Sequence, residues 1–326
     1  MIINNMNKEY GGCLPLEIKK LNTELFHGFD YVALNSGRNA IAYAARAFGY
    51  QTCYIPYYTC KTVEAGLQEV GVEVRYYNID DHFMPIEPKD GFDDKALFVY
   101  TNYFGIMTHV MQQDIIAEHS HVLFDNTQGF FTEPMRGTLS AYSCRKFFGV
   151  PDGAYLVGMD IPRLELATGT SADTAGFLLK SIETGPNQAY EMSKENEEHI
   201  NQEGMRFMSP LTSALMSGID FKSVSDQRIK NFNVLHESLK DINELDIKLE
   251  NGAPMVYPLL VAKDGIREAL VENKIFVPRW WRWIVESSDT NDFEKYLSKY
   301  LVPIPITQIY TEDDMKYIAE VVTRIM

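Results

Sequence analysis

The chain has 326 residues, of which 45% are hydrophobic and 23% are charged, a composition typical of a folded globular protein. Its 45 acidic residues outnumber its 30 lysines and arginines, which gives a net charge of −15. Because phosphate backbones and anionic lipids attract clustered cations, we expect neither a nucleic acid nor a membrane surface as a partner. The length suggests about two domains.

Targeting signals and disulfides are also not expected. No stretch approaches the roughly 18 consecutive apolar residues of a membrane-spanning helix. Residues 1–10 include Lys8, Glu9 and three asparagines, so they lack the apolar run of a signal peptide. The four cysteines form no CxxC pair and are too few for a disulfide scaffold. We therefore expect a protein of the reducing cytoplasm.

The first half of the chain alternates between strand and helix patterns. Apolar residues at helical spacing predict helices over residues 40–48 and 63–70. Short apolar runs predict seven strands, over residues 31–34, 52–55, 72–76, 96–100, 122–124, 139–143 and 154–157. Strands separated by helices indicate an α/β fold with a mostly parallel, seven-stranded sheet covered on both faces.

The second half has a different pattern. Residues 191–203 are polar and acidic, which favours a solvated loop or an exposed helix face. Residues 210–239 predict one long helix. Further on, the pattern predicts strands at 255–261 and 275–277 and helices at 265–273 and 313–325. We therefore predict a large domain over residues 1–204 and a smaller α+β C-terminal domain over residues 205–326.

Polar residues follow several of the predicted strands. They are Ser36, Gly37 and Arg38 after the first strand, then Asn102, Asp125 with Gln128, and Ser143 with Lys146. In an open α/β sheet, ligands bind beyond the carboxyl ends of the strands. These side chains are therefore the candidates for a binding or catalytic site.

The segment Ser36-Gly37-Arg38 lies where a strand turns into a helix. The free amides and positive end of the helix can bind an anion there, and Arg38 adds a cation suited to phosphate. The alternative is an ordinary turn with Ser36 as the helix cap. The chain lacks both GxGxxG and GxxxxGK[ST], so a dinucleotide site or a P-loop is not indicated.

Asp125 and Lys146 each have two interpretations when taken alone. Asp125 could cap a helix, or it could pair with a protonated ring nitrogen. Lys146 could be a surface residue, or it could be an amine nucleophile with a lowered pKa. An anion-binding turn, a strand-end carboxylate and then Ser-x-x-Lys follow the order of a pyridoxal-phosphate (PLP) site. The combination therefore predicts this cofactor.

Seven segments together resemble the DegT/StrS-type aminotransferases, which are fold-type I PLP enzymes that often act on nucleotide-linked keto-sugars. The segments are LNSGRNAI (34–41), YIPYYTCKT (54–62), NYFGI (102–106), LFDNTQGF (123–130), SCRKFFGVPDGA (143–154), MRFMSPLTSAL (205–215) and PIPITQIYTEDDM (303–315). The resemblance runs across nearly all of the chain, and it rests on the order and spacing of the segments.

The resemblance implies roles for individual residues. Lys146 is the Schiff-base lysine, Asp125 pairs with the pyridine nitrogen, and Gln128 lies near the 3-hydroxyl of the cofactor. The remaining cofactor-binding positions are Ser36, Gly37, Arg38, Asn102 and Ser143. Cys60 stands where the family places an aromatic residue against the ring, so Tyr57, Tyr58 or Tyr103 is expected to form that face.

The segment PRWWRW (278–283) contains all three tryptophans of the chain. It could pack the small domain or form a dimer contact. The resemblance places it near the entrance of the site, where Arg279 and Trp280 would contact the substrate. His119 and His121 lack further ligands at suitable spacing, so no metal site is predicted. Arg228 is interpreted as a structural residue.

The resemblance implies a PLP-dependent aminotransferase that forms a homodimer. It would move an amino group from an amino acid, expected to be L-glutamate, to a keto-sugar by a ping-pong Schiff-base mechanism. Two alternatives from other classes stay open: a dehydratase of the same fold and a non-catalytic binding or regulatory protein. A nicotinamide oxidoreductase is disfavoured because the glycine fingerprint is missing.

Overall fold

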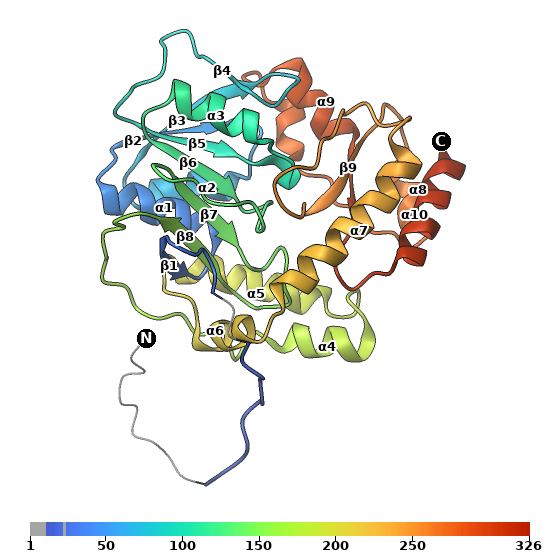
Figure 1. Cartoon of the computed structure of the whole chain (residues 1–326), viewed down its shortest axis with the longest axis horizontal. Coiled ribbons are helices and arrows are strands. Elements are labelled where there is room, and N and C mark those ends of the chain that lie inside the picture. Colours follow the sequence, from blue (N-terminus) through green and yellow to red (C-terminus); the bar gives the residue numbers. More distant parts are fainter. Residues whose placement is uncertain (1–10, 22–23) are drawn as a thin grey trace.

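Figure 1 shows a computed structural model of the chain, in which residues 11–21 and 24–326 are described. The expectation that residues 1–10 carry no signal peptide lies outside these described residues. Within them, no helix combines the length and the hydropathy that crossing a bilayer requires.

A central sheet of eight strands runs in the order β1-β8-β7-β6-β5-β2-β3-β4. Strands β4 and β8 run antiparallel to their neighbours, and the other pairings are parallel. The strands are β1 (Asp30–Leu34), β2 (Thr52–Pro56), β3 (Glu73–Ile79), β4 (Pro85–Ile86), β5 (Leu97–Thr101), β6 (Val122–Asn126), β7 (Leu139–Ser143) and β8 (Ala154–Gly158). The predicted mostly parallel α/β sheet is confirmed. The predicted count of seven strands is wrong by one, because the two residues of β4 are too few to form a periodic pattern.

Alternate residues of the strands point to two different layers. On β5, Leu97 and Val99 pack with helices α1 (Gly37–Phe48) and α2 (Lys61–Glu69). Phe98 and Tyr100 pack on the opposite face, against α3 (His109–Glu118) and side chains from the C-terminal part of the chain. Both faces of β5 are therefore buried, which explains its continuous apolar sequence.

The C-terminal part has its own core, built from residues of the range 232–322. There, the antiparallel strands β9 (Val256–Leu260) and β10 (Leu301–Pro305) pack with helices α7 (Phe221–Leu239), α8 (Ile266–Glu272) and α10 (Glu312–Ile325). Helix α9 (Asp292–Tyr300) lies between this core and the large sheet. The division of the chain at residue 205 stays a prediction.

Two predictions for the second half are wrong. Residues 210–239 form two helices, α6 (Pro210–Ser217) and α7, because Gly218 ends the first and the side chain of Asp220 caps the second. Residues 275–277 form no strand: Ile275 and Val277 are buried and Phe276 is half exposed, but the segment pairs with no other strand among the described residues. The alternating pattern of residues 275–277 therefore reflects which side chains are buried, and it does not indicate pairing with another strand.

The acidic stretch at residues 191–203 is helical. It forms α5 (Tyr190–Glu203), which follows α4 (Gly176–Thr184), and only Asn196 and Ile200 of α5 are buried. Most of α5 is therefore an exposed helix face, one of the two interpretations that the composition favoured. Its inner side lies next to the site described below.

Arg228 of α7 is almost completely buried, with 1% of its surface exposed. Its Nε donates to Oε1 of Gln308 at 2.9 Å, and its guanidinium also donates to the carbonyl oxygen of Met255 at 3.1 Å. The guanidinium lies 4.6 Å from the ring centre of Phe147, and burial lowers the pKa of Arg228 to about 10. This arginine therefore joins the C-terminal part to the segment that carries Lys146.

Glu294 of α9 is fully buried and attaches this helix to the end of β3. Its carboxylate accepts the backbone N–H of Ile79 at 3.1 Å and the side-chain N–H of Asn78 at 2.8 Å. It also accepts the backbone N–H of Asn291, which completes a capping box. Its replacement would leave the backbone N–H groups of Ile79 and Asn291 without their acceptor, while Asn78 would keep its bond to the carbonyl oxygen of Asp289.

We expect Glu294→Ala to lower the free energy of unfolding by about 2–4 kcal/mol, because unpaired buried donors are costly. Glu286→Ala is the matched control, since Glu286 is exposed, and it should change the stability by less than about 0.5 kcal/mol. Urea unfolding monitored by circular dichroism measures both values. Equal stabilities of the two variants would contradict this role of Glu294.

Candidate active site

A cavity of about 250 Å³ opens beyond the carboxyl ends of β1, β2, β6 and β7. The predicted site residues that line it are Ser36, Gly37, Arg38, Cys60, Asp125, Gln128, Ser143 and Lys146. Further lining residues include Thr59, Thr127, Arg145, Glu197 and Trp281. Four of the lining segments meet here because the strands that they follow end at the same edge of the sheet, and Glu197 and Trp281 complete the lining from later parts of the chain.

One wall of the cavity is the start of helix α1. Ser36 is the N-cap residue of α1, but its side chain makes no capping hydrogen bond, and its buried hydroxyl has no partner within the described part of the chain. The first amides of a helix likewise lack partners within the helix. This wall therefore offers unused hydrogen-bond donors and the positive helix end to an anion.

Gly37 is required at this wall for steric reasons. A Cβ atom at this position would lie 2.6 Å from Cγ2 of Thr127, well inside van der Waals contact. The absence of a side chain therefore lets α1 begin directly against the segment that follows β6. Next to it, the guanidinium of Arg38 donates to Oδ1 of Asn201, a residue of α5.

Thr127 connects the two residues that were predicted to be catalytic. Its backbone N–H donates to Oδ1 of Asp125 at 3.0 Å, and its Oγ1 accepts from Nζ of Lys146 at 3.0 Å. Asp125 is 3% exposed at the end of β6, where it cannot leave the cavity wall. A carboxylate and an amine are thus held on two sides of one threonine.

The side chain of Lys146 is exposed toward the cavity, and its amine lies among the groups that line it. Partial removal of the amine from bulk water lowers the pKa of Lys146, while the nearby Asp125 and Cys60 act in the opposite direction. The positive charge of Arg145 lowers the pKa further. The amine therefore loses its proton at a lower pH than an ordinary lysine does. In this neutral form it can act as a nucleophile.

Three predicted site residues lie behind the cavity and not on its lining. Tyr58 and Tyr103 are buried, and the hydroxyl of Tyr103 donates to the carbonyl oxygen of Tyr58 at 2.9 Å. Asn102 donates to Asn126 and Thr132 and accepts from the backbone N–H of Met107. These side chains form the packed support of the site and do not line its cavity, although Tyr103 lines a separate cavity of about 690 Å³.

The tryptophan segment contributes a different residue from the expected one. Arg279 donates from Nε to the carbonyl oxygen of Ser298 at 3.1 Å, and Trp280 stacks on Phe104. Trp281 lines the cavity instead, with its ring edge-on to Tyr58 at 4.5 Å between centres. The three adjacent aromatic and basic residues could not be ranked from the sequence, because a turn decides which of them faces inward.

Sequence reasoning also missed Thr127 and Glu197. Thr127 lies between Asp125 and Gln128 in the segment LFDNTQGF (123–130). This position was the feature of the sequence that could have identified Thr127 as a site residue. Glu197 belongs to an acidic helix in which several similar residues face solvent, and nothing in the sequence distinguishes it. Across the described residues, His, Cys, Asp and Glu form no group suited to a metal ion.

The fold is that of known sugar aminotransferases. The sugar aminotransferase CalS13 from Micromonospora echinospora superposes with a TM-score of 0.63 at 13% identity, over 90% of this chain and 87% of that one. PseC from Helicobacter pylori, an aminotransferase of pseudoaminic acid biosynthesis, gives 0.61 at 14% identity, over 90% and 86%. Spr1654 from Streptococcus pneumoniae, solved in a PLP form, gives 0.61 at 13% identity, over 91% and 88%.

These likenesses are structural. No family model and no curated protein matches the sequence. A DegT DnrJ EryC1 StrS aminotransferase from Brucella abortus also shares the fold, with a TM-score of 0.60. The fold that the sequence resemblance implied is therefore confirmed, whereas the roles of the individual residues stay predictions.

We expect Thr127→Val to lower the pKa of Lys146 further, because it removes an oxygen that accepts from the charged amine while keeping the volume of the side chain. Thr127→Ser keeps the hydroxyl and should restore the original value. The pH dependence of Lys146 labelling by acetic anhydride, followed by mass spectrometry, measures the shift. In the unmodified protein, Lys146 should react at lower pH than the surface lysines do.

Identical labelling profiles for the valine and serine variants would show that this hydrogen bond does not act on the amine. The labelling of surface lysines in the same sample serves as the internal control. It should be unchanged in all three proteins.

Proposed function

We propose that this chain is a PLP-dependent aminotransferase that moves an amino group from an amino acid, L-glutamate, to a keto-sugar linked to a nucleotide. The observation that carries the proposal is the pair of Lys146 and Asp125, joined through Thr127, in a cavity whose other wall is an unused anion-binding helix start. An amine, a carboxylate and a phosphate subsite are the groups that PLP requires.

The lining residues fit the cofactor. The unpartnered hydroxyl of Ser36, the first amides of α1 and the guanidinium of Arg38 would hold the phosphate. Asp125 would pair with the ring nitrogen, and Cys60 and Trp281 offer surfaces for the ring. Gln128 is partly committed, because its Oε1 accepts the N–H of Phe104 at 2.9 Å, which leaves its amide group available.

When bound, PLP supplies a ring that accepts electrons from the carbon whose proton is removed. The task of Asp125 is to keep a proton on the ring nitrogen, which a buried carboxylate does well because opposite charges attract strongly there. Lys146 would provide the covalent attachment point. Its neutral amine would take a proton from the substrate carbon as general base and return that proton as general acid. The lowered pKa of Lys146 favours the neutral amine.

The substrate class is supported by the fold of the neighbours. CalS13 is described as a sugar aminotransferase, and DesV from S. venezuelae, which shares the fold at a TM-score of 0.62, was solved with a ketimine intermediate. Spr1654 was solved in both PLP and PMP forms. We extend the cofactor and the keto-sugar acceptor to this chain as a proposal.

A homodimer is part of the proposal. Helix α4 has no buried residue, and its Leu179 and Ile182 are 66% and 84% exposed. Leu14 and Leu16 in the extended N-terminal arm are exposed as well. Such apolar side chains favour burial against a second copy of the chain.

The four free cysteines support the reducing cytoplasm as the compartment.

We expect the protein incubated with PLP to show an absorption band that L-glutamate converts into the band of the pyridoxamine form. Lys146→Ala should lose the covalently bound cofactor and all turnover, because no other amine can replace it. Lys222→Ala, in an exposed pair with Asp226 on α7, is the matched control and should behave as the unmodified protein.

Other results would redirect the proposal. A band that L-glutamate leaves unchanged would indicate another donor or a dehydratase. A protein that binds no PLP would be a non-catalytic relative of this fold.

We also expect the unmodified protein to be a dimer in size-exclusion chromatography with light scattering. Ile182→Glu would place a charge on the exposed apolar face of α4 and should shift the mass toward that of the monomer. Lys180→Glu on the same helix is the control, since it changes charge without changing the apolar side chains. A monomeric unmodified protein would contradict the dimer.

A further inference from the structure

Arg145 and Glu197 form an ion pair at the mouth of the cavity. The two side chains are not equally accessible: that of Arg145 is 22% exposed, and that of Glu197 is 49% exposed. The arginine is therefore fixed in the wall, whereas the carboxylate lies on the solvent side. Burial opposes ionisation of Glu197, but the hydrogen bond and charge of Arg145 outweigh it, so the pKa of Glu197 is lowered.

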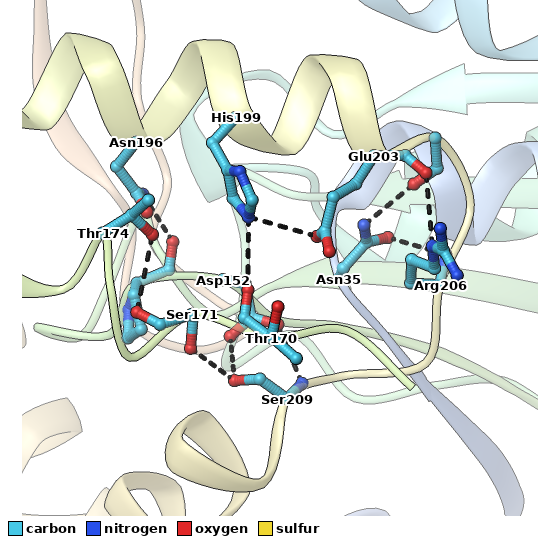
Figure 2. Close-up of polar contacts among 12 residues, drawn as sticks. Asn35, Asp152, Thr170, Ser171, Thr174, Asn196, His199, Glu203, Arg206 and Ser209 are labelled. Carbon is cyan, nitrogen blue, oxygen red and sulfur yellow. Dashed lines mark hydrogen bonds and ion pairs between the residues drawn. The ribbon is translucent and has the colours of Figure 1, made fainter. Parts of the chain in front are cut away.

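The helix that carries Glu197 is held firmly in place. Figure 2 shows His199 of α5 pointing toward Thr170 and joined to Glu203 of the same helix. Asn196 donates to the carbonyl oxygen of Pro151 at 2.7 Å, and Nε2 of His199 lies 3.3 Å from the carbonyl oxygen of Thr170. The glutamate can therefore leave Arg145 by rotating its own side chain, without movement of the helix.

Arg145 directly precedes Lys146, and its charge acts on the amine. In an amino acid, the carboxylate is attached to the same carbon as the nitrogen that reacts. The donor carboxylate must therefore lie close to the reacting amine. A guanidinium is well suited to bind it, because its planar fork matches a carboxylate.

We infer that Arg145 binds the carboxylate of the amino donor, and that Glu197 is an internal carboxylate that the donor displaces. The inference rests on the proposed function and names the residue that selects the donor. Glu197 keeps Arg145 paired in the absence of substrate and makes the site reject neutral amines, which cannot replace the lost ion pair.

The second arginine of the cavity has a different partner. Arg38 donates to Asn201, a neutral amide one helical turn beyond Glu197. Its charge also acts on Glu197, but it forms no ion pair among the described residues, so its guanidinium can bind the phosphate at the start of α1. Each arginine therefore binds a different anion: Arg38 binds the phosphate of the cofactor, and Arg145 binds the carboxylate of the substrate.

The test uses the PLP-loaded protein and 2-oxoglutarate, which has the carboxylates of glutamate but no amine to react. Isothermal titration calorimetry gives its dissociation constant. We expect Arg145→Gln to weaken binding more than tenfold, whereas Glu197→Gln should tighten it about fivefold by removing the competing charge. Glu198→Gln is the control and should leave the constant unchanged, because Glu198 and its hydrogen-bond partner Gln202 are both exposed.

Turnover provides a second readout. Arg145→Gln should raise the KM for L-glutamate while the PLP absorption band persists, and Arg145→Lys should restore part of the affinity because it keeps the charge without the fork. Arg38→Gln should instead weaken PLP retention.

Three results would overturn the inference. If PLP binds and both the Arg145 and Glu197 variants keep the original constant, the assignment of Arg145 is wrong and the proposed function stands. If PLP binds but the unmodified holoenzyme does not bind 2-oxoglutarate, the assignment of Arg145 and the choice of L-glutamate as donor are both wrong, and an aminotransferase with another donor stands. If the protein holds no PLP, the proposed function fails and this inference fails with it.

Discussion

Thr127 is the contact on which the geometry of the cavity depends. Its backbone fixes the carboxylate of Asp125, its hydroxyl fixes the amine of Lys146, and its methyl group lies against Gly37. Gly37, Asp125 and Lys146 come from three segments of the sequence, and they meet around the side chain of Thr127. The space between them is set by van der Waals contact on one side and by hydrogen bonds on the other, so it tolerates little change.

The cavity differs in charge from the chain as a whole. Two arginines, Arg38 and Arg145, line it together with two acidic residues, Asp125 and Glu197, and the amine of Lys146, while the whole chain has a net charge of −15. The two fixed guanidinium groups attract small anions at short range, because the low-dielectric walls concentrate their field. The surrounding surface repels large polyanions. Local and overall charge therefore select ligands by size.

Much of this arrangement could be predicted from the sequence. Buried parallel strands have continuous apolar runs, and the polar residues that follow them must meet at one edge, which located Ser36, Asp125 and Lys146. Side-chain direction within turns could not be predicted. Trp281 and not Trp280 faces the cavity, and Tyr58 and Tyr103 turn into the core, because tertiary packing decides these orientations.

The structure of the second half of the chain was harder to predict from the sequence, again because tertiary packing is not visible in the pattern. Periodicity reports which residues are buried but not how the segment is connected, so a helix break at Gly218 and an unpaired segment at 275–277 were not recognised. Glu197 was hidden among equivalent acidic residues of one helix. Its importance comes from Arg145, which lies 52 positions away in the sequence.

The buried Arg228 has a consequence for exchanging parts between proteins of this fold. Its guanidinium is satisfied by Gln308 and backbone carbonyls and lies on Phe147, and Gln308 donates to the carbonyl oxygen of Phe147 at 2.8 Å. A chimera that takes its C-terminal part from another protein would keep Phe147 but lose the Arg228 and Gln308 that cover it. These three residues therefore form one transplantable unit, and recombination of such chains should succeed only where all three are inherited together.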